Sequence, residues 1–160
     1  MPYEMKVDGM AEISETLSKL EDKAPGAAAR ALYKGAGIMA EEIKKGAEQI
    51  QTAPFRYVRD GASRLPSPEE KAIVLAAGAG IAKFDKNATE VNTSVGYKAS
   101  GYAYLKGKQK PVPLIVNAIN SGTSFMQKQP FIRKAAKSGG SKAIQVMKDS
   151  IEQDFSDLTK

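Results

Sequence analysis

The side chains that most often do chemistry in proteins are scarce in this 160-residue chain. It contains no cysteine and no histidine, so it lacks thiol nucleophiles, thiolate metal ligands and the commonest general base. An enzyme would have to use carboxylates, lysines or hydroxyls. The tight acid pairs Glu41-Glu42 and Glu69-Glu70 fall on helix surfaces that are predicted to be exposed, and adjacent residues on a helix do not face each other. We therefore expect no catalytic dyad, no enzymatic activity, no cofactor and no metal site.

Positive charge is concentrated in the second half of the chain. The net charge is +6, yet the stretch from Val91 to Lys148 contains no Asp or Glu. A long block of one sign indicates a surface that faces a polyanion. A solvated lysine-rich face, paired with the acidic part of a neighbouring copy, is the other interpretation. The cations of this block are Lys98, Lys106, Lys108, Lys110, Lys128, Arg133, Lys134, Lys137, Lys142 and Lys148.

Tyrosines and lysines alternate with glycines over residues 96–110. Tyr97, Tyr102 and Tyr104 lie among the lysines of this stretch. Basic and aromatic residues together can bind nucleic acid through phosphate contacts and base stacking. Tyrosines near glycines are also common in ordinary hairpins, and we favour a hairpin. Its exposed tip is expected to carry Lys106, Lys108 and Lys110.

The overall composition is that of one soluble globular domain. Hydrophobic residues make up 42% of the chain and charged residues 26%, and 160 residues are enough for a single core. No apolar run reaches the ~18–20 residues that span a bilayer. Residues 1–8 lack a basic region followed by an apolar one, so they do not read as a signal peptide. We expect no membrane contact and a protein that stays where it is made.

Helical spacing dominates the first third of the chain. A short strand is predicted over 3–7, and a helix capped by Asp8 over roughly 9–22. Pro25-Gly26 is expected to break the chain before a second helix over about 26–50. Part of that second helix is thin, which allows close approach to a sheet of the same chain or to another subunit. Its small residues are Ala27, Ala31, Gly35, Ala36 and Gly37.

The middle of the chain reads as a loop, a short helix and strands. Residues 52–66 form a predicted loop with three arginines, Arg56, Arg59 and Arg64, and loops often carry binding function. Ser67-Pro68-Glu69-Glu70 is a capping-box helix start, and that helix is expected to reach about Ala77. Strands are predicted over 81–84 and 90–97, joined by a turn at Asp85-Lys86-Asn87, and the apolar run 114–119 returns to the core.

A last long helix is predicted to begin near Pro130 or Phe131, with Gly139-Gly140 as a candidate interruption. Lysines fill its first half and acids its end, the reverse of what the helix dipole favours. A polyanion bound near the helix start, or end-to-end pairing between subunits, would account for this polarity. The cations at the start are Arg133, Lys134 and Lys137, and the acids at the end are Asp149, Glu152, Asp154 and Asp157.

These elements predict a single α+β domain over residues 1–160. A small antiparallel sheet is expected to pack against a long N-terminal helix and a long C-terminal helix. The turn before the last helix carries a distinctive set of residues. Gly122, followed by Thr123, permits backbone angles closed to other residues. Pro130 suits a helix start, and Phe131 anchors that start in the core. We interpret this segment as architectural, with the 124–129 loop available to a ring interface.

The same segment resembles a known family. Ser121-Gly122-Thr123-Ser124, Pro130-Phe131-Ile132-Arg133 and Ala136 are similar to a signature of the neck, or tail-completion, proteins of tailed double-stranded DNA phages. The family often has an acid two positions before the Gly-Thr, where this chain has Asn120. Weaker matches extend the resemblance over almost the whole chain. They lie at Val7-Asp8-Gly9-Met10, Ile81-Ala82-Lys83 and Val95-Gly96-Tyr97.

The resemblance implies a structural virion protein without enzymatic activity. Such a protein forms a ring, six-fold by family resemblance, that joins the head connector to the tail and lets DNA pass. Its partners would be its own copies, portal or connector proteins, and tail-tube or tail-terminator proteins. Its place would be the neck of the virion, assembled in the host cytoplasm. The basic block alone supports a second hypothesis, a stand-alone nucleic-acid-binding protein without sequence specificity.

Overall fold

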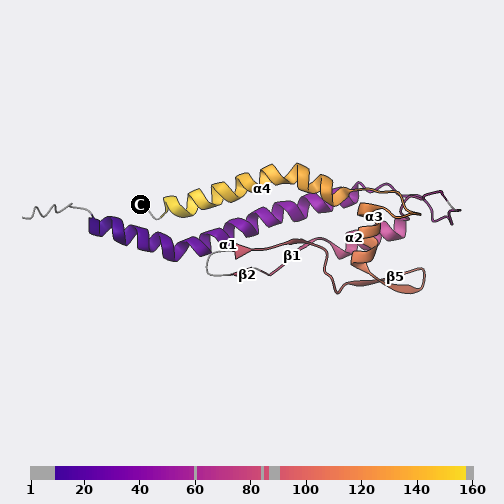
Figure 1. Cartoon of the computed structure of the whole chain (residues 1–160), viewed down its shortest axis with the longest axis horizontal. Coiled ribbons are helices and arrows are strands. Elements are labelled where there is room, and N and C mark those ends of the chain that lie inside the picture. The colour runs from indigo at the N-terminus through magenta and orange to yellow at the C-terminus, as the bar shows by residue number, and fades with distance from the viewer. Residues whose placement is uncertain (1–9, 60, 84, 87–90, 158–160) are drawn as a thin grey trace, which may run out of the picture.

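The computed structural model describes residues 10–59, 61–83, 85–86 and 91–157. Over these ranges the chain is an elongated α+β fold (Figure 1). Its helices are α1 (Met10–Glu48), α2 (Pro68–Ala77), α3 (Val112–Ser121) and α4 (Phe131–Ser156). None of the helices in these ranges is long and apolar enough to cross a bilayer. The predicted α+β class, with a long helix near each end of the chain, is confirmed.

Short strands pair in antiparallel ribbons of two strands each. β1 (Gly80–Ile81) pairs with β4 (Val95–Gly96), and β2 (Asp85–Lys86) pairs with β3 (Val91–Asn92). β5 (Tyr102–Leu105) pairs with β6 (Lys108–Pro111). In Figure 1, α1 lies between α4 on one side and the β1 and β2 ribbons on the other. The strands therefore flank the helix pair rather than forming one sheet beneath it.

The predicted turn at Asp85-Lys86 is wrong. Both residues lie in β2, where Asp85 pairs with Asn92 and Lys86 with Val91. Asp and Lys are poor strand formers by propensity, but pairing across the ribbon decides the conformation here. The predicted strand over 3–7, the Asp8 cap and Asn87 lie outside the described residues.

Helix α1 continues through Pro25, where a break was predicted. A proline in a helix interior removes one hydrogen bond and costs about 3 kcal/mol. The end of α4 lies beside this part of α1, since Lys23 and Ala27 line one pocket with Asp154 and Phe155. Figure 1 shows α1 bent in its N-terminal half, the half that contains Pro25. Packing against α4 offsets the missing hydrogen bond, so the proline bends the helix without ending it.

Small residues bring α1 and α4 close together along an antiparallel seam. Gly35 of α1 lies against Met147 of α4, and a Cβ built on Gly139 would lie 2.9 Å from Cγ of Glu42. The thin stretch of α1 was predicted to face a sheet or another subunit. Its Gly35 meets α4, which was not predicted, and α1 also contacts the strands β1, β3 and β4. Gly139-Gly140 does not interrupt α4, because Gly139 is buried where the two helices approach each other.

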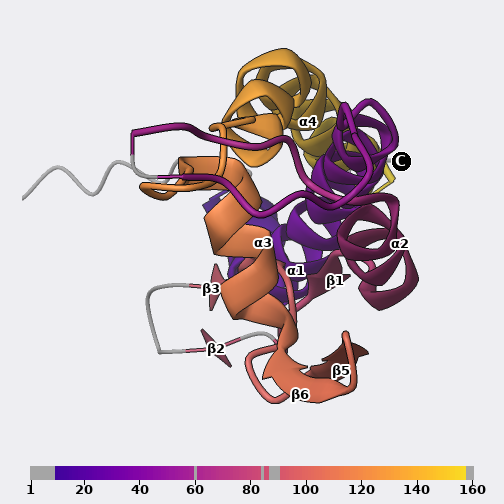
Figure 2. The same ribbon diagram turned by 90° about the vertical axis from the view of Figure 1, so that its right-hand side faces the viewer.

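The main hydrophobic core lies at the end of the molecule where α1 ends and α4 begins. Helix α3 crosses this region (Figure 2), and Ile119 of α3 is fully buried. The apolar run 114–119 does return to the core, within a helix that its two prolines obscured in the sequence. Pro111 and Pro113 occupy the start of α3, where missing N–H groups break no helical bond. The core comprises Ile43, Ala47, Ile50, Val74, Leu105, Val112, Ile115, Val116, Ile119, Met126, Phe131 and Ala135.

Candidate functional site

Gly122 closes α3 with a backbone that other residues rarely adopt. Its φ is 77°, and its N–H donates to the Ala118 carbonyl at 3.0 Å. A Cβ at this position would lie 3.0 Å from Cβ of Lys128. Both the left-handed angle and the close approach of the following loop therefore require glycine here.

The segment after Gly122 joins parts of the chain that are distant in sequence. Thr123 and Met126 exchange backbone hydrogen bonds at 3.0 and 3.3 Å. The Arg64 N–H donates to the Phe125 carbonyl at 2.9 Å, which ties the segment to the 52–66 loop. The Gln129 side chain accepts from the Gln51 N–H at 2.9 Å and donates to the Gln51 carbonyl at 2.8 Å. This segment thus fastens α3, the loop and the end of α1 together.

Helix α4 begins on two anchors. The Asn120 Oδ1 accepts a hydrogen bond from the Ile132 N–H at 3.1 Å, which satisfies one of the free donors of the first turn. Pro130 supplies no side-chain cap. Phe131 is buried in the core, with its ring edge-to-face against Tyr97 at 6.4 Å between centroids. Gly122, Thr123 and Phe131 therefore have architectural roles in this structure, and Pro130 directly precedes the first turn of α4.

A buried ion pair holds the 52–66 loop against α2. Arg64 donates to both carboxylate oxygens of Glu70, at 2.7 and 2.6 Å. The Ser67 N–H also donates to Glu70 at 2.7 Å, and the Ser67 hydroxyl accepts from the Glu70 N–H at 3.2 Å. This confirms the predicted capping box. The expectation of an exposed helix surface is wrong for Glu70, which is 4% exposed. Burial alone would raise the pKa of Glu70, but the hydrogen bonds from Arg64 and Ser67 and the Arg64 charge outweigh it and lower the pKa.

The loop and the β5–β6 hairpin meet through a cation–aromatic cluster. Lys106 and Gly107 form the hairpin turn with φ values of 53° and 73°, as a two-residue turn of right-handed twist requires. The Lys106 ammonium lies over the ring of Phe55. The Phe55 and Tyr57 rings lie edge-to-face at 5.3 Å between centroids. Desolvation, and then the Arg64 charge, lower the pKa of Lys106.

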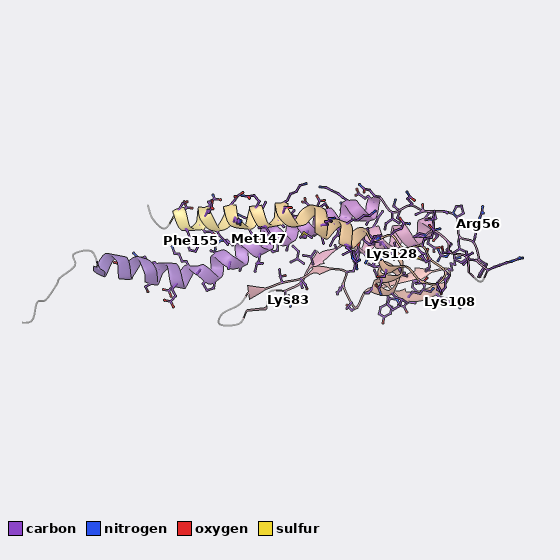
Figure 3. The ribbon with its side chains drawn as sticks, turned by 45° about the horizontal axis from the view of Figure 1, so that its top comes forward. Arg56, Lys83, Lys108, Lys128, Met147 and Phe155 are labelled. Atoms are coloured by element: carbon purple, nitrogen blue, oxygen red, sulfur yellow. The ribbon has the colours of Figure 1, made fainter. Side chains whose placement is uncertain are left out.

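The exposed residues around this cluster are here called the loop–hairpin end. Tyr57 is 93% exposed, Tyr104 71% and Tyr102 62%. Figure 3 shows Arg56 and Lys108 at the same end of the molecule. Lys110 is half-buried on β6, whereas Lys106 and Lys108 are exposed, so the predicted exposed tip consists mainly of Lys106 and Lys108. The exposed members are Arg56, Tyr57, Arg59, Tyr102, Tyr104, Lys106 and Lys108, and the half-buried Phe55 is included with them.

The second predicted group of cations lies elsewhere. Arg133, Lys134 and Lys137 are exposed on the first two turns of α4. Figure 2 shows α4 and the β5–β6 hairpin on opposite sides, with α1 and α3 between them. The six predicted contact residues therefore form two separate basic surfaces. The loop arginines and the hairpin lie far apart in the sequence, and no local signal in it indicates that Phe55 and Lys106 meet.

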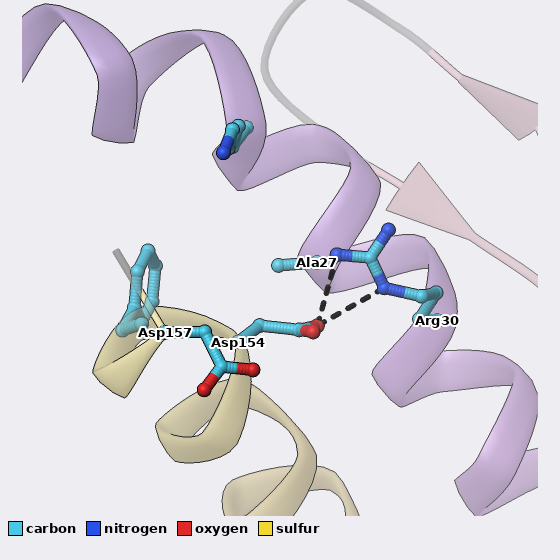
Figure 4. A pocket seen from close by; sticks show the side chains of 6 residues that line it. Ala27, Arg30, Asp154 and Asp157 are labelled. Carbon is cyan, nitrogen blue, oxygen red and sulfur yellow. Dashed lines mark hydrogen bonds and ion pairs between the residues drawn. The ribbon is translucent and has the colours of Figure 1, made fainter. Parts of the chain in front are cut away.

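Acidic residues gather at the other end of the long axis. Asp149, Glu152 and Asp157 are exposed near the end of α4, with Lys148 beside them. Asp154 pairs with Arg30 of α1 at 3.1 Å and closes one side of a cavity of about 180 Å³ (Figure 4). Figure 3 places Phe155 at this end and Arg56 at the opposite one. These exposed acids thus lie far from Arg56 and Lys108, in a region that also contains the cations Lys23, Arg30 and Lys148.

Concave surfaces offer little chemistry. An open groove of about 540 Å³ lies between the end of α2 and the β1–β4 ribbon, lined mainly by small residues and by Tyr97. Burial raises the pKa of Tyr97 to about 12, so its hydroxyl stays protonated. Within the described ranges, no group of three or more acids could hold a metal ion.

No protein-family model, curated protein or solved structure matches this chain.

Proposed function

We propose that this chain is a structural virion protein of the neck of a tailed double-stranded DNA phage. Copies of it form a ring, a hexamer, that joins the head connector to the tail and lets DNA pass, without enzymatic activity. The portal or connector and the tail-tube or tail-terminator proteins are its partners in the virion. One observation carries the proposal: the exposed cations Arg56 and Lys108 lie at one end of the long axis, and the exposed acids Asp149 and Glu152 lie on the last turns of α4, whose Phe155 is at the other end.

Separated charge supports ring assembly because a closed ring uses heterologous contacts. In such a ring, one surface of a subunit meets a different surface of the next. A molecule with cations and acids on distant surfaces offers complementary contacts between copies and suppresses like-with-like pairing. Cations that are not covered by a neighbour can attract DNA phosphates. That attraction is independent of sequence, which suits DNA that must pass without being read.

The resemblance to phage neck proteins supports the same proposal. It rests on the Gly122–Ala136 segment, which fastens α3, the 52–66 loop, α1 and α4 in this structure. An acidic side chain at the position of Asn120 would accept the same bond from the start of α4. The difference at this position therefore preserves the local geometry.

The direct test is an electron cryo-microscopy reconstruction of the assembled ring. We expect Lys106, Lys108 and Lys110, or the start of α4 at Arg133, to face the lumen or a neighbouring subunit. If both basic surfaces lie on the outer, solvent-facing wall of the ring, the proposal that they line a DNA channel is contradicted. Subunits that make isologous two-fold contacts instead of a closed ring would contradict the assembly proposal.

The loop–hairpin end favours a second candidate, a stand-alone nucleic-acid-binding protein without sequence specificity. Its cations and exposed tyrosines occupy one region of the surface. Salt-dependent binding of nucleic acid by the isolated monomer, together with absence from purified particles, would favour this candidate. The absence of a nucleic-acid gel shift at low salt, together with incorporation of the protein into virions, would exclude this candidate.

A further inference from the structure

We infer that the loop–hairpin end binds single-stranded nucleic acid more tightly than duplex, with bases stacked on its tyrosines and phosphates held by its cations. The inference deepens the second candidate function by naming its ligand class, and it does not depend on ring assembly. The passage of duplex DNA through a ring needs phosphate attraction alone. Exposed aromatic rings at the same place add a contact that duplex DNA cannot use.

The outer face of the hairpin presents two rings at a fixed spacing. Tyr102 and Tyr104 are exposed on β5, while Leu105 is buried in the core. Residues two apart on a strand point to the same face and lie about 6.6–6.8 Å apart. The stacking distance of bases is about 3.4 Å. The backbone spacing of Tyr102 and Tyr104 is therefore about twice the stacking distance, which leaves room for one base between their rings.

Gln109 lies directly opposite Tyr104 across the ribbon. Directly opposed residues share a face of the hairpin, so an amide that can donate and accept hydrogen bonds borders the rings. Stacking with a flexible polar neighbour is tolerant of base identity. We therefore expect little sequence preference.

The third ring is held in place by contacts between the loop and the body. Tyr57 packs edge-to-face on Phe55, which itself lies under the Lys106 ammonium and 4.8 Å from the Arg64 guanidinium carbon. Arg64 is fixed by the bidentate pair with Glu70. Ordering before binding lowers the entropy lost when a ligand docks. Tyr57 is thus an exposed but supported stacking surface.

The charges around the rings suit phosphates. Among the described residues, Arg56, Arg59 and Lys108 have no ion-pair partner. Glu70 is already neutralised by Arg64. Glu69 is exposed and accepts a long hydrogen bond of 3.5 Å from the Lys106 N–H. The excess of unpaired positive charge at the loop–hairpin end favours a polyanion as the ligand over a protein surface of mixed charge.

The preference for single strands follows from what each form exposes. Phosphates are available in both forms, so the cations bind both. Base faces are available only when the bases are unstacked from each other. Each tyrosine that stacks on a base should therefore favour the single strand by about 5-fold to 100-fold.

Fluorescence measurements on the purified full chain test the inference. The chain has six tyrosines and no tryptophan, so quenching of tyrosine emission reports stacking directly. The probes are a fluorescein-labelled oligothymidylate of about 20 nucleotides and a duplex of equal length. About 20 nucleotides exceed the site size of a typical single-strand-binding domain. We expect the single strand to bind at least about 5-fold tighter, with quenching.

Paired variants separate stacking from charge. The double variant Tyr102→Ala/Tyr104→Ala should lose the single-strand preference, while Tyr102→Phe/Tyr104→Phe should keep it because the rings remain. Both pairs of side chains are exposed, so circular dichroism and thermal unfolding should match the parent chain. Equal affinity for single strand and duplex in the parent chain, or an unchanged preference in the alanine variant, would overturn the inference.

A matched charge control uses the second basic surface. Lys106→Gln/Lys108→Gln should weaken binding of both nucleic acids and reduce the salt dependence. Lys134→Gln/Lys137→Gln removes the same charge from α4, on the opposite side of the molecule, and should have the smaller effect. Equal losses from both pairs would overturn the assignment of the site. Absence of binding by the parent chain at low salt would overturn it as well and would favour a protein partner at this end.

Discussion

The α1–α4 helix pair and the loop–hairpin end are held together by different forces. The helix pair is a long seam of small residues, where Gly35 and Gly139 allow close packing. The loop–hairpin end depends on a few polar and cation–aromatic contacts, such as Arg64–Glu70 and Lys106–Phe55. The difference shows how one small chain forms a long, closely packed helix pair and also presents an exposed basic end. The core around Phe131 connects the two regions.

The largest expected effect on stability comes from removing the core ring of Phe131, which connects the two regions. Phe131→Ala removes a buried ring from the core and should lower the free energy of unfolding by about 4 kcal/mol. Because Phe131 touches both regions through the core, they should lose stability together. Chemical denaturation followed by circular dichroism measures this. Phe125→Ala is the control, since Phe125 is exposed. A loss confined to one region would contradict the shared core.

The next effect should be confined to the loop–hairpin end. Glu70→Gln leaves the Arg64 charge buried without its partner and should cost about 3 kcal/mol of stability. Hydrogen exchange should show the 52–66 loop opening while α1 and α4 stay protected. Uniform loss of protection across the chain would contradict two regions of separate stability.

The same variant predicts a change in acid stability. The folded-state pKa of Glu70 is lowered, so its contribution is present above the ordinary value of 4.5 and is lost as pH falls through the lowered pKa. Glu70→Gln removes this contribution at every pH. The parent chain should therefore lose more stability than Glu70→Gln when the pH falls below 4.5. Parallel pH dependence of the two proteins in urea denaturation would refute this account.

A smaller effect on stability should come from the α1–α4 helix pair and not from the loop–hairpin end. Gly139→Leu places a side chain where a Cβ already meets Glu42 at 2.9 Å, and overpacking should cost about 2 kcal/mol. Gly140→Ala is the matched control, since nothing lies within 4 Å of its Cβ position, and it should raise stability by up to about 1 kcal/mol. Thermal unfolding of the two variants gives the comparison. Similar shifts in both would contradict a close seam at Gly139.

The smallest expected effect concerns the junction at the start of α4. Asn120→Ala removes the cap on the Ile132 N–H and should cost about 1 kcal/mol. Asn120→Asp keeps an acceptor and places a negative charge near a helix N-terminus, so it should match or exceed the parent stability. Denaturant midpoints of the three proteins measure the difference. A loss in Asn120→Asp equal to that in Asn120→Ala would show that the side chain does not act as a cap.

Short-range chemistry in the sequence was sufficient for several elements. The Ser67–Glu70 capping box predicts the start of α2, and the structure contains both of its hydrogen bonds. The tyrosines near glycines over residues 96–110 predict the hairpin, and its turn at Lys106-Gly107 has two positive φ angles. Gly122 and Phe131 predict a turn followed by an anchored helix, which the structure contains. In the capping box and the hairpin turn the interacting residues are within a few positions of each other, whereas Phe131 is anchored by distant residues such as Tyr97.

The sequence by itself determined the α+β class, the two long helices near its ends and the concentration of lysines in its second half. Only the tertiary structure decided that α1 continues through Pro25, that its thin face meets α4, and that Arg64 is held by Glu70 instead of being exposed. It also decided that Phe55 and Lys106 meet and that Arg133 lies on a different surface. Local patterns encode hydrogen bonds and angles between near neighbours. Contacts between distant segments depend on how the helices pack, and no short stretch of sequence contains that information.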